Sequence, residues 1–307
     1  MYRFTGIILS ALLVAETGSA QTLTDSITVD AQTRRALEGA RQRTVRYQPG
    51  DETVLPGETG LFILEKIDIF SVRGGASMGF SSNPARNDLG GPESPFVSAF
   101  VDAGVDTRID QSFDVGARFS LSTTQFTGVD NLSSTAAILS GYVGREIAYG
   151  VYAQADFNLG WSIANGGLSD ATAFYGAGLS LRRGFLLHPR VALTPSVSAG
   201  YSGSEVSELE SYSISGGAEL DVLVAEGLTT KTSAQVIFRE FPDFFESTTG
   251  VARHDLAFSL GVAASYALSD FAAANISLGY TTNQSSLDIS DYDNIDGLLG
   301  ASIIFKF

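Results

Sequence analysis

The sequence predicts an all-β fold: a closed, antiparallel transmembrane β-barrel of about twelve strands, preceded by a short N-terminal helical and linker extension. Apolar side chains occupy every second position in many segments long enough to cross a bilayer as tilted strands. A period of two places these side chains on one face of an extended strand. The connections alternate between short and long. Beyond residue 20, no apolar run is as long as a membrane-spanning helix, which needs about 20 residues.

The composition agrees with a barrel that disperses its apolar content. The charged fraction is 17%, against about 25% in soluble domains, and the mean hydropathy is +0.13. The chain has no cysteine, which excludes a disulfide framework, a thiolate metal site and a lipid-bearing N-terminal cysteine. Alternation is the way in which a β-barrel carries lipid-facing residues without a long apolar run.

Residues 1–20 have the three-part layout of a secretory signal peptide. Arg3 precedes an apolar run over Ile7–Ala15, and small residues follow up to Ala20. Because this run is too short for a stable membrane-spanning helix, we predict cleavage near Ala20 and export from the cytoplasm. An uncleaved N-terminal anchor is the alternative.

Residues 21–67 are predicted to form a periplasmic extension ahead of a barrel over residues 68–307. The stretch SITVDAQTRRALEGARQR is typical of a short polar helix, and YQPGDETVLPGETG is a linker punctuated by proline and glycine. Either this extension is poorly ordered, or its helix lies in the lumen as a plug or rests under the mouth of the lumen. In the second case its arginines would meet acidic lumen residues.

Each predicted strand shows the same alternation. In VYAQADFNLGWSI the apolar face carries Phe157, Leu159 and Trp161, and the other face carries Asp156 and Asn158. Short turns alternate with polar loops such as FPDFFESTTGVARH and NQSSLDISDYDNID, which predicts short periplasmic turns and long external loops. The predicted strands cover residues 68–81, 95–109, 111–124, 135–147, 150–164, 171–183, 187–202, 211–225, 228–239, 255–268, 271–284 and 296–307.

The last strand ends the chain on an apolar face, in LLGASIIFKF. We expect it to pair with the first strand, because an open edge in hydrocarbon would leave backbone groups without partners. Phe305 and Phe307 are predicted to lie at the membrane interface. They also resemble the C-terminal signal by which bacterial outer-membrane barrels are recognised by their assembly machinery. A secreted β-sandwich or β-helix is the alternative.

The opposite face of the strands is predicted to line the lumen. Its charged positions comprise six acids and six bases, so neither sign dominates, as it would in a strongly selective pore. The charges either pair across strands and fill the interior, or border a narrow water-filled channel. Both are possible because a twelve-stranded barrel is wider than barrels filled by side chains and narrower than barrels with an open aqueous channel. The lumen-lining candidates are Arg73, Asp102, Asp106, Asp114, Arg118, Asp156, Arg182, Glu219, Asp221, Lys231, Arg239 and Lys306.

Charge and histidine content argue against several functions. The net charge of −15 makes nucleic acid an improbable partner, since phosphate binding needs basic patches. The run DISDYDNID could hold Ca²⁺ through carboxylates, but it lacks a regular ligand loop and an acidic solvated loop is favoured. The chain has two histidines: His188 in a predicted periplasmic turn, and His254 in a predicted outer loop with Asp255 directed to the opposite face. We therefore predict no enzyme, catalytic residue, cofactor or metal site.

Both ends of the barrel resemble a family of bacterial β-barrel porins. The resemblance rests on two segments. The segment that leads into the first strand is YQPGDETVLPGETGLFILEKIDIFSVRGGASMGFSSNPARN, and the segment that ends the chain is SLGYTTNQSSLDISDYDNIDGLLGASIIFKF. Because members often accompany exopolysaccharide production genes, the resemblance implies a polysaccharide-related role as one alternative.

The expected function is a passive, porin-like channel for small hydrophilic solutes in the bacterial outer membrane. The alternatives are a component of surface polysaccharide export or assembly, with polysaccharide as cargo, and a non-conducting structural or adhesive barrel. The expected partners are outer-membrane lipids, lipopolysaccharide and the barrel assembly machinery.

Overall fold

A computed structural model describes residues 70–86, 88, 93–109, 113–129, 132–148, 150–164, 171–245, 252–269 and 271–307. The predicted signal peptide and the extension over residues 21–67 lie outside the described residues. The strands are β1 (Phe70–Ser81), β2 (Ser94–Ile109), β3 (Phe113–Phe126), β4 (Ser134–Ala148), β5 (Val151–Ala164), β6 (Ala171–Arg183), β7 (Phe185–His188), β8 (Val191–Ser204), β9 (Ser211–Ala225), β10 (Leu228–Phe245), β11 (Ala252–Ala267), β12 (Ala272–Ser285) and β13 (Tyr292–Lys306).

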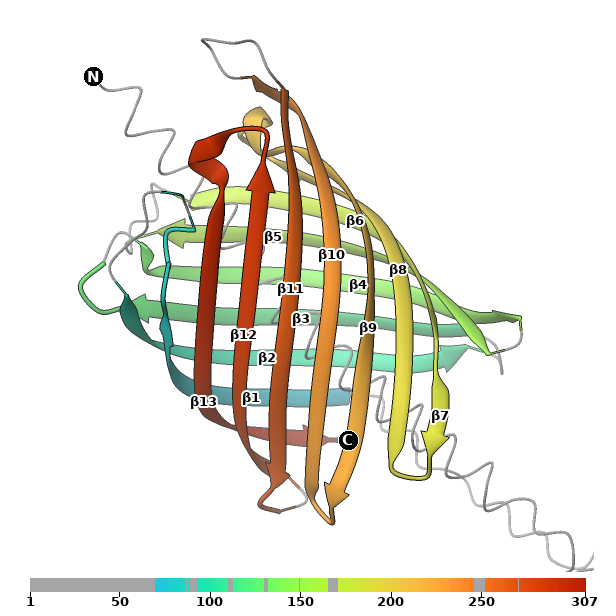
Figure 1. Cartoon of the computed structure of the whole chain (residues 1–307). Helices are drawn as coiled ribbons and strands as arrows, with labels where there is room; N and C mark the ends of the chain where they lie inside the picture. Colours follow the sequence, from blue (N-terminus) through green and yellow to red (C-terminus); the bar gives the residue numbers. More distant parts are fainter. Residues whose placement is uncertain are drawn as a thin grey trace, which may run out of the picture.

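Twelve of these strands form a closed antiparallel barrel, and β7 is one extra strand. Each barrel strand pairs with its neighbours in the sequence, β6 pairs with β8, and β13 returns to pair with β1. Figure 1 shows β8–β13 as the near wall and β1–β6 as the far wall. The predicted fold class, strand number and closure between the last and first strands are confirmed.

The seam between β1 and β13 runs over the whole of β1. Its register extends from Ser71 opposite Lys306 to Ser81 opposite Asp296. Beyond β13, the Phe307 amide donates to the Phe70 carbonyl at 2.9 Å, and the Phe70 amide donates to the Phe307 carbonyl at 3.3 Å. The last residue therefore completes the ladder, which satisfies backbone groups that an open edge would expose.

The apolar side chains of the barrel point outward. The exposed large apolar side chains alternate with less exposed, mostly polar ones, as in β13, where Leu299, Ile303 and Phe305 are exposed. Few large apolar side chains in the described part of the chain are buried. The fold is thus stabilised by its backbone ladders and inner-face contacts rather than by a packed apolar core. No helix among the described residues is long and apolar enough to cross a membrane.

The two ends of the barrel differ. The turn end carries both chain ends of the barrel and the connections β2–β3, β4–β5, β6–β8, β9–β10 and β11–β12. The loop end carries the other connections, and 3₁₀ turns lie at Ser207–Leu209 and Asp288–Ser290 within their described parts. The strands reach further toward the loop end than predicted: β10 continues to Phe245, β11 begins at Ala252 and β13 begins at Tyr292.

Two of the sequence predictions are wrong in detail. The stretch FPDFFESTTGVARH is not all loop, because its two ends extend β10 and β11 with a register shift after Phe241. The strand predicted over 187–202 begins later, at Val191: residues 187 and 188 belong to β7, which pairs with the start of β8 across a turn at Pro189 and Arg190. Pro189 has no amide hydrogen to donate to a ladder, and it occupies the turn between the two strands.

Candidate functional site: the charged inner face

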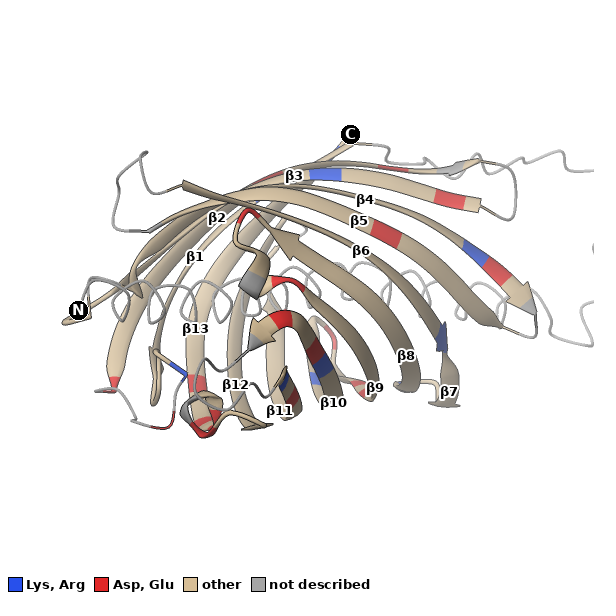
Figure 2. Cartoon of the chain, turned by 90° about the horizontal axis from the view of Figure 1, so that it is seen from above, with Lys and Arg blue, Asp and Glu red and all other residues tan. Residues whose placement is uncertain are grey.

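All twelve lumen-lining candidates occupy positions opposite in parity to the exposed apolar side chains of their strands. Acidic and basic positions occur on both walls of the barrel (Figure 2). Lys306 lies at the turn-end rim and is exposed. Three groups of contacts connect most of the others, two on the β1–β6 wall and one on the β8–β10 wall.

The first group joins β1 to β4 near the turn end. Arg73 Nε lies 3.1 Å from Asp102 Oδ1, and Arg118 Nε lies 4.0 Å from the same oxygen. Arg118 Nη2 also lies 3.8 Å from Asp106 Oδ2. The Tyr142 hydroxyl donates to Asp106 Oδ1 at 2.8 Å. Two carboxylates thus alternate with two guanidinium groups, and a tyrosine ends the chain of contacts.

The register of the strands explains this alternation. Arg73 and Asp102 are direct cross-strand partners, while Arg118 is opposite Gly104, midway between Asp102 and Asp106 on β2. Opposite charges on directly facing or diagonal inner positions are close enough to pair.

The second group joins β3, β5 and β6. The Tyr152 hydroxyl donates to Asp114 Oδ2 at 2.9 Å. The Arg182 guanidinium lies over the Tyr152 ring, with Cζ 4.7 Å from the centroid, and donates to Gln154 Oε1 at 3.4 Å. Gly144 provides the space for this ring, because a Cβ there would collide with the Tyr152 hydroxyl.

The third group lies on the other wall. Lys231 Nζ is 3.6 Å from Glu219 Oε2, and Lys231 is the direct cross-strand partner of the buried Asp221. Asp156 makes no hydrogen bond or ion pair within the described part of the chain. Most of the inner acids therefore lie beside bases, whereas Asp156 does not.

These inner charges keep some contact with solvent. The side chains of Arg73, Asp106 and Glu219 are 14%, 18% and 22% exposed. Around them, the inner positions of β8 and β9 are mainly serine, threonine, glycine and alanine. The small side chains leave this part of the inner face with little side-chain volume.

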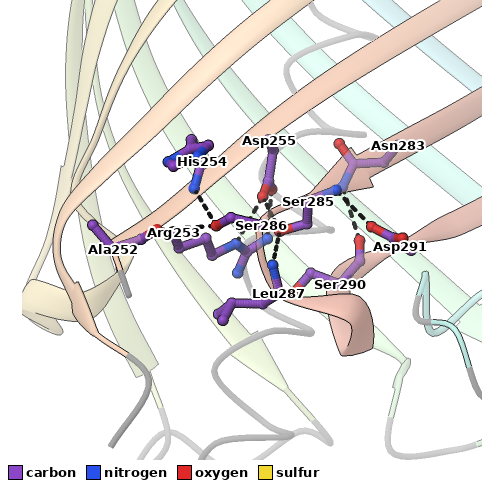
Figure 3. Close-up of polar contacts among 10 residues, drawn as sticks. All are labelled: Ala252, Arg253, His254, Asp255, Asn283, Ser285, Ser286, Leu287, Ser290 and Asp291. Atoms are coloured by element: carbon purple, nitrogen blue, oxygen red, sulfur yellow. Dashed lines mark hydrogen bonds and ion pairs between the residues drawn. The ribbon is translucent and has the colours of Figure 1, made fainter. Parts of the chain in front are cut away.

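A further inner cluster, near the loop end, escaped the sequence prediction (Figure 3). Arg253 donates to Asp255 through Nε at 3.1 Å and Nη2 at 2.6 Å, and the Ser285 hydroxyl donates to Asp255 Oδ1 at 2.6 Å. The guanidinium of Arg253 lies over two rings, 4.4 Å from the Phe241 centroid and 5.5 Å from the Phe244 centroid. Arg239 is directly opposite Asp255 on β10.

This loop-end cluster holds the β12–β13 loop against the barrel. The Ser285 amide donates to Asp291 Oδ1, and the Leu287 amide donates to Ser285 Oγ at 3.2 Å. Asn283 Nδ2 donates to the Ser290 carbonyl at 2.8 Å. Arg253 shares the inner parity of Asp255 on β11, but it lies in the stretch FPDFFESTTGVARH, which the sequence predicts as a loop.

A second loop-end contact set lies at the β1–β13 seam. The buried Asn294 accepts hydrogen bonds from the Ser81 hydroxyl at 3.0 Å and the Asn83 amide at 2.8 Å. Its Nδ2 donates to Asp296 Oδ2 at 2.8 Å, and Arg86 Nη2 lies 3.4 Å from the same oxygen. The start of the β1–β2 loop is therefore bound to β13.

The histidines do not form a catalytic arrangement with these groups. The prediction that His254 is a loop residue is wrong, because it lies in β11, where its amide donates to Ser286 Oγ at 3.0 Å. Its side chain is exposed near the Phe238 ring on the outer face, while the adjacent Asp255 points inward. His188 is the last residue of β7. The described residues contain no group of three or more side chains able to hold a metal ion.

Comparison with known proteins identifies the architecture but no family. No protein-family model matches the sequence, and no curated protein matches it. An outer-membrane channel from Pseudomonas putida F1 aligns over 84% of this chain and 100% of its own, with a TM-score of 0.52 and 12% identity. At this identity the comparison shows that the two chains share a barrel fold.

Two further solved structures align less well. KdgM porin in complex with disordered oligogalacturonate aligns over 75% of this chain and 98% of its own, with a TM-score of 0.41 and 9% identity. The beta domain of the Bordetella autotransporter Brka aligns over 78% of this chain and 100% of its own, with a TM-score of 0.45 and 15% identity.

Proposed function

We propose that this protein is a bacterial outer-membrane barrel that acts as a porin-like passive channel for small hydrophilic solutes. The observation that carries the proposal is the division of the closed barrel into an apolar outer face and a polar, charged inner face with residual solvent contact. An apolar exterior of this extent is compatible with hydrocarbon and unfavourable in water. A closed ladder leaves no backbone group unsatisfied in lipid.

The inner charges favour a weakly selective conduit. Each ion pair combines a base with an acid within 4.0 Å, so a passing ion meets no ring of one sign. The small inner side chains of β8 and β9 face a wall bearing arginines and tyrosines. This arrangement supports passage of small hydrated solutes rather than tight binding of one substrate.

Planar-bilayer recording of the purified mature protein tests the proposal. We expect stepwise conductance increments after insertion, and swelling of liposomes that contain the protein in small neutral sugars. A folded, inserted protein that gives no current at any voltage and no swelling would contradict the channel. Heat-dependent migration on a denaturing gel, compared between boiled and unboiled samples, reports separately whether the barrel is folded.

A further inference from the structure

The outer surface of the turn end carries basic and apolar side chains that the channel does not use. Among the described strand residues near this end, the outward-facing charged side chains are Arg145 on β4 and Arg183 on β6, both exposed. Arg190, in the β7–β8 turn, is also exposed. The described acid of the turns is Glu226, between β9 and β10. Glu146, near the end of β4, faces inward, and its carboxylate accepts from the Gly150 amide.

Each strand arginine is held over an aromatic ring instead of a carboxylate. Arg145 Cζ lies 4.8 Å from the centroid of Phe113, its direct partner on β3. Arg183 Cζ lies 4.9 Å from the centroid of Phe185. Within the described part of the chain, neither guanidinium makes an ion pair. A guanidinium held by its face keeps its planar N–H edges available for a phosphate.

The extra strand β7 adds an apolar projection beside these arginines. β7 pairs with β8 alone, through Phe185 opposite Leu193 and Leu186 opposite Ala192. The turn end of β5 lies at Val151, which is opposite Arg183 on β6, so β5 does not extend along β7. Leu186 and Leu187 are 45% and 61% exposed although successive side chains point to opposite faces. Both faces of this hairpin are therefore apolar, beyond the point where the barrel wall ends.

The loop end has the opposite character. The exposed charged residues of its strands, within the described residues, are the acids Glu240, Asp243 and Asp293, apart from His254. Exposed acids also flank its strands at Glu93 and Glu205. The two rims of the apolar outer face thus differ in sign, and the turn-end rim alone combines arginines with an apolar projection.

We propose that the turn-end rim, defined by Phe113, Arg145, Arg183 and the β7 hairpin, binds the headgroups of anionic phospholipids. This inference rests on the membrane placement in the proposed function. The rim continues the apolar outer face, so leucines would enter the acyl boundary while guanidinium groups meet phosphates. A lipid is the occupant because its acyl chains can contact the exposed leucines beside the arginines, whereas free phosphate makes no apolar contact with them.

Native mass spectrometry of the full mature protein in detergent tests this proposal. The probes are phosphatidylglycerol and phosphatidylcholine with identical acyl chains, added at equal concentration. We expect preferential retention of phosphatidylglycerol. Arg145→Gln and Arg183→Gln should each lower that retention about fivefold, the effect of one basic side chain at an anionic surface. Leu187→Ser should lower retention of both lipids, and excess inorganic phosphate should displace neither.

Arg86→Gln is the matched control, because it removes the same charge at the loop end. Equal retention of the two lipids by the wild type would overturn the proposal, as would unchanged retention in folded Arg145→Gln/Arg183→Gln or displacement by inorganic phosphate. Conductance separates the two proposals, since neither arginine faces the lumen. A protein that retains phosphatidylglycerol without conducting contradicts only the channel, and one that conducts without lipid preference contradicts only the rim site.

Discussion

Neutralising Asp102 tests whether the inner charges stabilise the barrel as a connected network. This carboxylate is 3% exposed and lies 3.1 Å from Arg73 Nε and 4.0 Å from Arg118 Nε. Asp102→Asn keeps the size of the side chain and removes its charge. Arg73 then loses an ion pair, while Arg118 retains Asp106 at 3.8 Å.

The expected loss of stability follows from these distances and exposures. Breaking one side of a buried ion pair costs about 3 to 5 kcal/mol, and a hydrogen bond to a charged group contributes about 1.5 to 3 kcal/mol. The arginine side chains keep 14% and 12% exposure, so water offsets part of the buried cost. We therefore expect Asp102→Asn to lower the free energy of unfolding by about 2 to 3 kcal/mol.

Urea unfolding from lipid vesicles measures this loss, with fluorescence of Trp161 as the probe. Trp161 is the one tryptophan of the chain, and it faces outward on β5, so its emission reports transfer between lipid and water. Asp156→Asn is the matched control on the same inner face, since Asp156 makes no ion pair within the described residues. We expect that control to lose no more than about 0.5 kcal/mol.

A double-mutant cycle with Arg73→Gln separates pairing from a general effect of charge. The double variant should lose less stability than the sum of the single variants, because each single variant already breaks the pair. Equal losses for Asp102→Asn and Asp156→Asn, or a coupling below about 0.5 kcal/mol, would refute the network.

Three further predictions concern ring packing, closure and selectivity. Gly144→Ala should lower the free energy of unfolding in urea by about 1 to 3 kcal/mol, because the added Cβ collides with Tyr152. Gly216→Ala is the control and should leave this free energy nearly unchanged, because its Cβ would meet its nearest neighbour at 4.0 Å. Equal losses for the two variants would contradict the prediction. Deleting Phe307 removes two backbone hydrogen bonds to Phe70 and should lower the folded fraction in the outer membrane, with an unchanged fraction contradicting the role of this end. At 1 M salt, where the Debye length is about 3 Å, the reversal potential should show little preference between K⁺ and Cl⁻. At low salt it should shift toward cations, because the charge of the acidic loops is less screened. A strong preference at high salt would indicate unbalanced lumen charge.

The strand content and the closure were predictable because they depend on local alternation. A period of two is visible in any window of strand length, and it assigned inward positions to Asp102 on β2 and Arg118 on β3 before any pairing was known. An odd number of crossings would have separated the chain ends. The closure of β13 on β1 follows from the need to pair both edges.

The partners of each inner charge were not predictable, because they depend on register. Arg73 meets Asp102, 29 residues away, and a shift of one residue between β1 and β2 would exchange inner and outer faces. The β7 hairpin and the loop-end cluster around Arg253 escaped for related reasons. A turn at Pro189 and Arg190 interrupts a segment that alternates like a strand, and the extension of β11 depends on pairing with β10 across a register shift.

Alternation along the sequence assigns each residue to a strand face, and it therefore places the apolar side chains outward around a closed polar interior. The pairing of acids with bases, the packing of Tyr152 against Gly144, and the position of two rim arginines over phenylalanines depend on the tertiary structure. The physical reason is range: alternation is a property of neighbours along the chain, whereas each contact requires a register set by the whole ring of strands.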